Sequence, residues 1–504
     1  MKQANHWLSA LTLIAMAAFA QNAWAAVCTS LSTGTWNTAA RWSCGHVPVA
    51  ADTVVIAHNI TLNANPTVAG LTINAGQTLD DNGNGKDITV TGNVVNNGTY
   101  GVAGGGDLFM TGAGTTISGT GSFIDTKLTI DASNITLLAD STMNFASKAQ
   151  IEVKKNVSSF TMAGTITDVG QPAGKTILKV KKDSTATISG TVNAPNSVID
   201  LDKNTTLTNN GTVNVQSLKG KDATSVWTQG ANSSLTVTQT PDGKWNGTLN
   251  ASATGNTVTY GGTANPLTPS DNAYYHLTLS GSGAQTLPTD LTVAGNFTMS
   301  GTATTDAPAA LTVGGNFIIG ADNTFTPGTG TVTLNGTAAQ TIGGTDPVSF
   351  NNLTVTNEAS PNITLATNVT VEGTLTGTVT LTNTCPTHYT LTSNGGATVV
   401  DSCPEPGVSS INTSDADPTT TGASVDWTVT FSESVTGVDA TDFALVEGGG
   451  ATGTSISGVS GSDTTWTVTA STGAGALPLP SPASTMPSAP PASASAIGAS
   501  SIPA

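Results

Sequence analysis

The chain has 504 residues, of which 9% are charged and 5% aromatic, and its formal net charge is −17. This acidic excess argues against nucleic acid or an anionic membrane as the main partner. A chain of this length can bury a large core, and its composition, with 56 glycines, favours a linear core over a single globule.

Residues 1–25 have the pattern of a secretory signal peptide. Lys2 provides a short basic region, residues 8–20 an apolar core, and Ala-Trp-Ala at 23–25 a small-x-small cleavage site before Ala26. The apolar run is short for a membrane span, although an uncleaved anchor is the alternative. We expect a secreted protein, extracellular or on the cell surface of a bacterium, with no transmembrane segment after cleavage.

Residues 26–79 are predicted to form an N-terminal cap and the first coils of a repeat. They contain Gly-Thr-Trp at 34–36, Arg-Trp-Ser-Cys-Gly-His-Val-Pro at 41–48 and Asp-Thr-Val-Val-Ile at 52–56. These motifs resemble the opening of the extracellular eight-glycine domain and of many secreted bacterial β-helix proteins. Two tryptophans and a disulfide would then cover the strand edges that the end of a solenoid exposes.

The cysteines form two local pairs, Cys28 with Cys44 and Cys385 with Cys403, separated by 16 and 18 residues. In an exported chain these spacings suggest two local disulfides, each contributing roughly 3 kcal/mol by loop-entropy estimates. A metal site is the alternative, but no Cys-x-x-Cys spacing supports it.

Residues 80–403 are predicted to form a parallel β-helix. Short Gly/Ser-Thr-hydrophobic steps recur every 21 to 26 residues and indicate stacked repeats. The runs between them are β-branched, roughly alternating and bounded by turn residues, as in strands. We therefore predict an all-β, right-handed solenoid with one coil per repeat. The steps begin at Gly98, Gly119, Ser141, Gly164, Gly190 and Gly211, with Gly76 extending the series backward.

Three of the coils carry a matched lysine: Lys155, Lys182 and Lys203. Each precedes the next step by 8 or 9 residues, so we expect the three to stack as a column on one outer face. Such a column can bind an acidic surface glycan, or it can solubilise the face and block pairing of sheet edges.

A turn at residues 80–85 satisfies the first half of a calcium-loop pattern. Asp80, Asn82 and Asn84 offer oxygen ligands at positions 1, 3 and 5, but position 12 is Thr91 rather than the usual bidentate glutamate. Calcium is therefore the one possible cofactor, and a polar turn between two coils is the alternative.

A second kind of repeat occupies residues 250–400. Tyr-His-Leu-Thr-Leu at 275–279 and Asn-Asn-Leu-Thr-Val at 351–355 are each followed by a unit of the Leu-Thr-Val-x-Gly-Asn type. These segments resemble units of large bacterial surface β-helices.

Residues 404–407, Pro-Glu-Pro-Gly, read as a linker, and the pattern changes after them. Residues 408–475 resemble a bacterial Ig-like sandwich module of the kind found in adhesins, with its closing strands missing. Residues 476–504 are rich in Ala, Ser and Pro and are predicted to be disordered. The abrupt change after residue 475 leads us to expect a frameshift that truncates a longer protein; a genuine flexible tail is the alternative.

These features favour a non-catalytic structural or adhesive protein that contacts cell-surface or extracellular glycans or proteins. One alternative is a polysaccharide-active β-helix lyase or hydrolase, which needs convergent acidic groups. The adjacent pair Asp80-Asp81 would point to opposite faces of a strand, and Asp200 with Asp202 has no evident third partner. A pilus-assembly accessory protein is a further alternative, because similar Ig-like repeats occur in such proteins.

Overall fold

The structure is a computed structural model that describes residues 25–102, 105–239, 245–383, 389–394, 399–400, 406–413, 424–446, 453–471 and 500–503. Nearly all of its regular structure is β, arranged as a parallel β-solenoid of about 16 turns. The chain falls into two compact units. The first contains Met1–Ala359, Thr367–Thr378 and Leu391–Ala397, and the second Ser360–Ala366, Val379–Thr390 and Thr398–Ala504.

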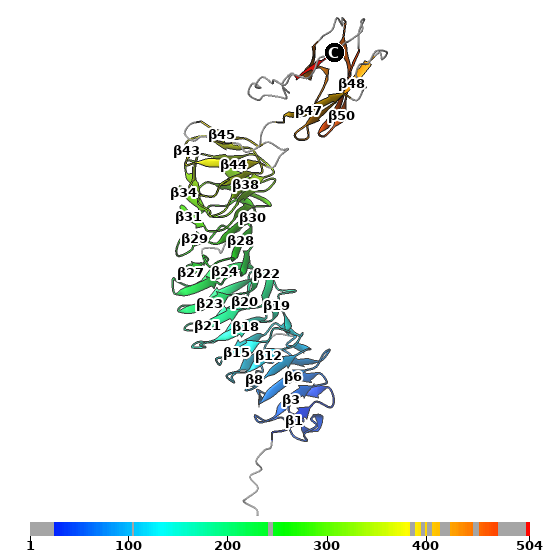
Figure 1. Ribbon diagram of the computed structural model, residues 1–504. Helices are drawn as coiled ribbons and strands as arrows, with labels where there is room; N and C mark the ends of the chain where they lie inside the picture. Colours follow the sequence, from blue (N-terminus) through cyan, green and yellow to red (C-terminus); the bar gives the residue numbers. More distant parts are fainter. Residues whose placement is uncertain are drawn as a thin grey trace, which may run out of the picture. The chain divides into compact units, whose positions relative to one another are not determined.

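One wall of the first unit is an 11-stranded parallel sheet to which each turn contributes one short strand. Figure 1 shows these strands following one another along the unit. Its strands are β1 (Val27–Thr29), β3 (Thr53–Ile56), β6 (Gly70–Ile73), β9 (Val94–Asn96), β12 (Thr116–Ser118), β15 (Ile135–Leu137), β18 (Phe160–Met162), β21 (Thr185–Ile188), β23 (Thr205–Asn209), β25 (Ser225–Gln229) and β27 (Thr248–Asn250).

A second wall pairs in parallel from turn to turn in the same way. It contains β2 (Gly34–Thr35), β4 (Ile60–Thr61), β7 (Thr78–Asp80), β10 (Thr99–Tyr100), β13 (Ser122–Ile124), β16 (Thr142–Ala146), β19 (Thr165–Thr167), β22 (Thr191–Leu201), β24 (Thr212–Gly220), β26 (Ser234–Val237), β28 (Thr257–Gly262), β30 (His276–Ala284), β32 (Phe297–Met299), β35 (Phe317–Ile319) and β38 (Gln340–Gly344).

A third row of strands, here called the third wall, completes the early turns. It contains β5 (Thr67–Val68), β8 (Ile88–Val90), β11 (Leu108–Met110), β14 (Lys127–Ile130), β17 (Gln150–Val153) and β20 (Lys175–Val180), and it continues in the second halves of the long strands β22 and β24.

Later turns of the first unit use other strands. A 6-stranded sheet holds β29 (Ala273–Tyr274), β31 (Asp290–Val293), β34 (Ala310–Val313), β37 (Thr331–Leu334), β40 (Asn352–Val355) and β43 (Leu375–Thr376). The same turns also contain other strands that lie between these in the sequence: β33 (Thr302–Asp306), β36 (Thr324–Thr326), β39 (Val348–Phe350), β42 (Val369–Val371) and, after the last of them, β45 (Leu391–Ser393).

The core consists of inward side chains that repeat at the same place in successive turns. Alternate residues of each short strand point inward, so parallel pairing places like side chains above one another. Tyr100, Phe123 and Phe145 form one such column, with ring centroids 6.0 and 5.1 Å apart. Phe297 and Phe317 stack at 5.2 Å in a later column. The apolar face that a single turn cannot bury alone is thus covered by its neighbours.

The register confirms most of the predicted steps and corrects one. Thr142, Thr165, Thr191 and Thr212 pair in succession, as the repeat predicts. Thr99 instead lies opposite Ser122, so the step at Gly98 aligns with the pair 121–122 and not with the one at Gly119.

The second unit contains β41 (Ile363–Leu365), β44 (Val379–Asn383) and β46 (Val399–Val400), which pair in parallel. Its antiparallel 4-stranded sheet is made of β47 (Val408–Thr413), β48 (Ser424–Phe431), β51 (Thr465–Ser471) and β50 (Ser455–Ser462). Trp427, Val429 and Val468 lie in the core beside this sheet. An Ig-like identity for this segment stays a prediction.

Two short stretches differ in kind from the solenoid. The 3-10 helices η1 (Ala39–Arg41) and η2 (Ala440–Asp442) interrupt the β structure of the described residues.

The strand β52 (Ser500–Pro503) pairs in parallel with β49 (Phe443–Val446). The sequence predicts disorder for residues 476–504, of which the structure describes only these four, and the disordered tail stays a prediction.

Candidate functional site

The three predicted lysines, here called the lysine row, occupy equivalent turns of successive coils. The backbone N–H of Asn156 donates to the carbonyl of Lys182, and that of Asp183 donates to the carbonyl of Lys203, both at 3.3 Å. These bonds place Lys155, Lys182 and Lys203 in register. The predicted column is therefore present in the structure.

The residue after each lysine explains why these turns repeat. Asn156, Asp183 and Asn204 adopt left-handed backbone conformations, with φ of 65°, 62° and 53°. Asn and Asp tolerate this region better than other residues with side chains, because their short polar groups bond locally. A Lys-Asn or Lys-Asp pair after an outer strand thus forms a tight turn that shows the lysine to solvent.

Carboxylates accompany the lysine row. The Lys182 ammonium lies 3.4 Å from Asp183, and the Lys203 ammonium lies 3.1 Å from Asp222 in the next coil. The hydrogen bond from Asn204 lowers the pKa of Asp183, and the charges of Lys182 and Lys155 lower it further. The Lys182 and Lys203 side chains stay 48% and 52% exposed, so their ammonium groups remain accessible to a ligand.

A ladder of alternating charge runs beside the lysine row on the third wall. Glu152, Lys179, Asp200 and Lys219 pair in succession across β17, β20, β22 and β24. Lys179 and Asp200 form an ion pair of 2.8 Å. Sequence reasoning did not find this ladder, although opposite charges one coil apart in consecutive strands are a signal for it.

The turn at 80–85 is organised by a residue outside the predicted calcium set. Asp81 is buried, and its carboxylate accepts backbone N–H bonds from Gly83, Lys86 and Gly106 at 3.1, 2.8 and 3.1 Å. A carboxylate with three such donors satisfies its own charge within the fold. The signal for this role is a carboxylate followed by a glycine-rich turn.

The predicted calcium ligands have other contacts. The Asp80 carboxylate accepts the N–H of Val102 at 3.1 Å, and the Asn84 side chain donates to the Asp81 carbonyl at 2.7 Å. Asn82 is exposed, with φ of 53°. These contacts fit the polar-turn interpretation of the sequence, and calcium binding stays a prediction.

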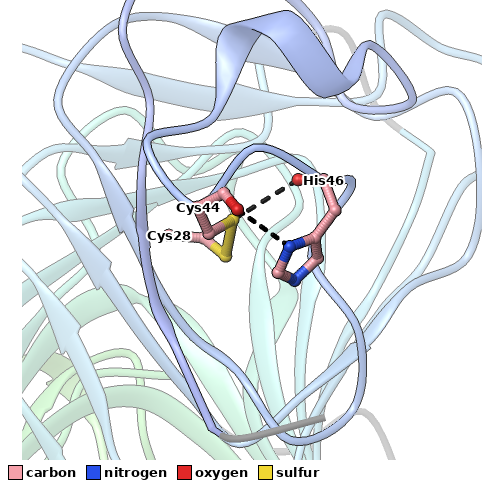
Figure 2. Close-up of side chains that lie close together, drawn as sticks. All are labelled: Cys28, Cys44 and His46. Atoms are coloured by element: carbon pink, nitrogen blue, oxygen red, sulfur yellow. Dashed lines mark hydrogen bonds between the residues drawn. A yellow bond between two sulfur atoms is a disulfide. The ribbon is translucent and has the colours of Figure 1, made fainter. Parts of the chain in front are cut away.

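The N-terminal cap holds the predicted disulfide between Cys28 and Cys44, whose Cα atoms are 5.0 Å apart. Figure 2 shows His46 beside it, with its Nδ1 3.0 Å from the Cys44 carbonyl. The two sulfur atoms and a ring nitrogen of His46 lie within 4.8 Å of one another. Both sulfurs are consumed by the disulfide, so metal ligation would first need reduction. Cys385 and Cys403 lie outside the described residues.

A shallow cleft of about 300 Å³ lies between residues 284–289 and 304–309. Threonine side chains dominate its lining, together with Leu287 and Pro308. Asp306 is the single carboxylate among its lining residues, whereas glycoside hydrolysis uses two.

Within the described residues, we find no helix with the length and apolar character required to cross a membrane. Comparisons of the chain with protein-family models, with curated proteins and with solved structures find no match.

Proposed function

We propose that the chain is an exported bacterial surface or matrix protein with a structural or adhesive role. In this proposal the solenoid contacts acidic glycans through the lysine row. The in-register stacking of Lys155, Lys182 and Lys203 carries the proposal. It makes a line of positive charge from residues that are 27 and 21 positions apart in sequence.

The spacing of this line suits a linear polymer. Neighbouring strands of a sheet lie about 4.8 Å apart, so ammonium groups on adjacent coils can meet charges on one extended chain at the same time. A polysaccharide with a carboxylate or sulfate on successive sugars has such charges. Its acidic groups would compete with Asp183 and Asp222 for the lysines, which is feasible because exposed ion pairs contribute only about 0–1 kcal/mol each.

The signal-peptide pattern and the resemblance of residues 26–79 to extracellular β-helix proteins support export. The solenoid supports a structural role, because shape and repetition present one surface many times over.

Binding of the exported chain to immobilised uronic-acid and neutral polysaccharides tests the proposal. Changing Lys155, Lys182 and Lys203 together to Gln should weaken binding to the acidic polymer about tenfold or more, since three contacts of up to ~1 kcal/mol are lost. The salt dependence of binding should also decrease. Neutral polymers should bind weakly to both proteins.

A matched control replaces Lys86, Lys148 and Lys175 by Gln, which removes the same charge from other positions. Affinity close to that of the parent protein is expected for this control. Equal losses in both triple variants would show that only net charge matters. Unchanged binding in the first variant would leave the lysine row with a solubilising role.

A further inference from the structure

A fully buried carboxylate lies at the point where the chain enters the fold. Asp52, which precedes β3, has no exposed surface. Its Oδ1 accepts the backbone N–H of Ala26 at 2.9 Å. Its Oδ2 accepts the N–H of Val49 and contacts Nε2 of His46, both at 2.9 Å. Aspartate is rarely buried to this extent unless its charge is matched by a partner.

Within the described residues, which begin at Ala25, Ala26 is held by backbone hydrogen bonds. Its carbonyl accepts the N–H of Thr53 at 2.9 Å, and β1 begins at Val27 opposite Thr53. Ala25 is exposed, whereas Ala26 is half-buried. This change in exposure falls at the bond that follows Ala-Trp-Ala at 23–25, the small-x-small pattern of a signal-peptide cleavage site.

We propose that processing cuts the chain between Ala25 and Ala26, and that the α-ammonium group released at Ala26 binds the buried Asp52 carboxylate. This inference rests on the proposed export. In the cut, water adds across the peptide bond: its oxygen joins the Ala25 carbonyl carbon to give a carboxylate, and the Ala26 nitrogen takes up protons to become an ammonium. A peptidase that recognises small residues before the cut supplies the catalysis.

Replacing the Ala26 amide by an ammonium group changes the charge and the hydrogen bond that this nitrogen offers to Asp52. In the uncut chain Ala26 offers Asp52 a single neutral N–H. In the cut chain the same nitrogen offers a full positive charge and a charge-assisted hydrogen bond, which is roughly twice as strong. His46 is the other titratable group in contact with Asp52 among the described residues, and its side chain is 46% exposed. The ammonium would keep the buried charge matched at pH values where His46 is neutral.

The reactivity of the α-amine tests this pairing. Two proteins are released from a removable fusion partner, one beginning at Ala26 and one at Ala25, and each extends to residue 504. Acylation of the α-amine at pH 7 is followed by mass spectrometry of the N-terminal peptide. An ordinary α-amine has a pKa of about 7.7–8.0, and a rise of one unit slows acylation about tenfold. We expect the Ala26 amine to react at least that much more slowly than the exposed Ala25 amine.

Asp52→Asn in the protein beginning at Ala26 should restore fast acylation, whereas Lys148→Gln should not. If Asp52→Asn fails to fold, the comparison of the Ala25 and Ala26 proteins decides alone. Equal rates for those two proteins would overturn the pairing with Asp52.

N-terminal sequencing of the chain expressed with residues 1–25 in a secreting bacterium tests the cut itself. A mature N-terminus at Ala26 supports the proposal, and cleavage at another bond overturns it. Retention of the uncut chain inside the cell would contradict the proposed function and the processing together. The acylation rates test only the pairing with Asp52. A failure of that pairing can therefore be distinguished from a failure of the proposed cut or of the proposed function.

Discussion

Trp42 donates its indole N–H to the backbone carbonyl of Trp36 at 2.8 Å, and the two rings pack edge to face with centroids 4.9 Å apart. Both side chains are almost completely buried. This pair forms the apolar centre of the N-terminal segment that the sequence predicts to be a cap. The two indoles are not equivalent, because the Trp36 N–H has no hydrogen-bond partner among the described residues.

This asymmetry predicts unequal effects of two similar substitutions. Trp42→Phe should destabilise the cap by about 1–3 kcal/mol beyond the loss of ring volume, because the Trp36 carbonyl is left unpaired. Trp36→Phe removes an N–H that is already unpaired, and it serves as the matched control. Native-state hydrogen exchange of amides in β1 and β3 measures the local stability. Equal effects would show that ring volume alone determines the stability of the cap.

Asp81 and Asp80 should differ strongly in their contributions to stability. Asp81→Ala removes the acceptor of three backbone N–H bonds and should destabilise the turn by about 2 kcal/mol or more. Asp80→Ala removes one bond, to Val102, and should cost less than about 1 kcal/mol. Melting temperatures with and without a calcium chelator complete the test. We expect no effect of chelation on the parent protein; a decrease that Asp80→Ala abolishes would establish calcium binding.

Two buried tyrosines form a hydrogen-bonded chain. Tyr274 donates to the carbonyl of Leu267, so Tyr260, 2.8 Å away, donates its own proton to the Tyr274 oxygen. Burial raises the pKa of Tyr260 to about 12, so this hydroxyl stays protonated at ordinary pH. Tyr274→Phe leaves two groups unpaired and should cost about 1–3 kcal/mol. Tyr260→Phe leaves the bond from Tyr274 to the Leu267 carbonyl intact, so it should lower the free energy of unfolding by less, as measured by chemical denaturation.

The stability of the cap should depend on pH through His46 and Asp52. The hydrogen bond with Asp52 raises the pKa of His46. The stabilisation that protonated His46 contributes is therefore complete below the usual histidine pKa of about 6.5. It is lost as the pH rises through the raised pKa that His46 has in the folded protein. Burial alone would raise the pKa of Asp52, but the N–H groups of Val49 and Ala26 and the His46 ring outweigh burial and lower it. Its contribution is lost only as pH falls through that lowered value.

His46→Gln should consequently reduce hydrogen-exchange protection of β1 more at pH 5 than at pH 9, after correction for the intrinsic rates. In an Asp52→Asn background this difference between the two pH values should disappear. A difference that persists there would assign the pH dependence to another group.

The second cysteine pair gives a covalent prediction. Cys385 and Cys403 should form a disulfide under oxidising conditions, as Cys28 and Cys44 do in the structure. Peptide mapping without reduction should detect both bonds. Free thiols at 385 and 403, or a bond between the two pairs, would contradict the prediction.

The repeat of Thr142, Thr165, Thr191 and Thr212 is visible in the sequence because each turn needs the same residue type at the same place. The register between the step at Gly98 and the following coil, near Gly119, was harder to predict. The pairs 119–120 and 121–122 both combine glycine with a hydroxyl residue, and a shift of two residues preserves the alternation of a strand. Only the pairing of backbones, Thr99 with Ser122, distinguishes them.

In the candidate sites, too, the contacts that depend on three-dimensional pairing could not be predicted from the sequence. The lysine row follows from spacing, but the ion pair between Lys203 and Asp222 joins different coils and depends on side-chain direction. Asp81, and not its neighbour Asp80, organises the turn at 80–85 for a related reason: adjacent residues satisfy the same composition, and the fold decides which of them points inward. The contact between Ala26 and Asp52 spans 26 residues and has no local signal.

The register of Lys182 with Lys203 and of Thr191 with Thr212 means that one complete coil has the same 21-residue length at both places. Deletion or duplication of residues 182–202 would leave each remaining strand beside an equivalent partner. Unequal recombination between such gene segments could therefore lengthen the solenoid by one coil at a time. Each longer protein would keep the same pairing of core residues between neighbouring coils.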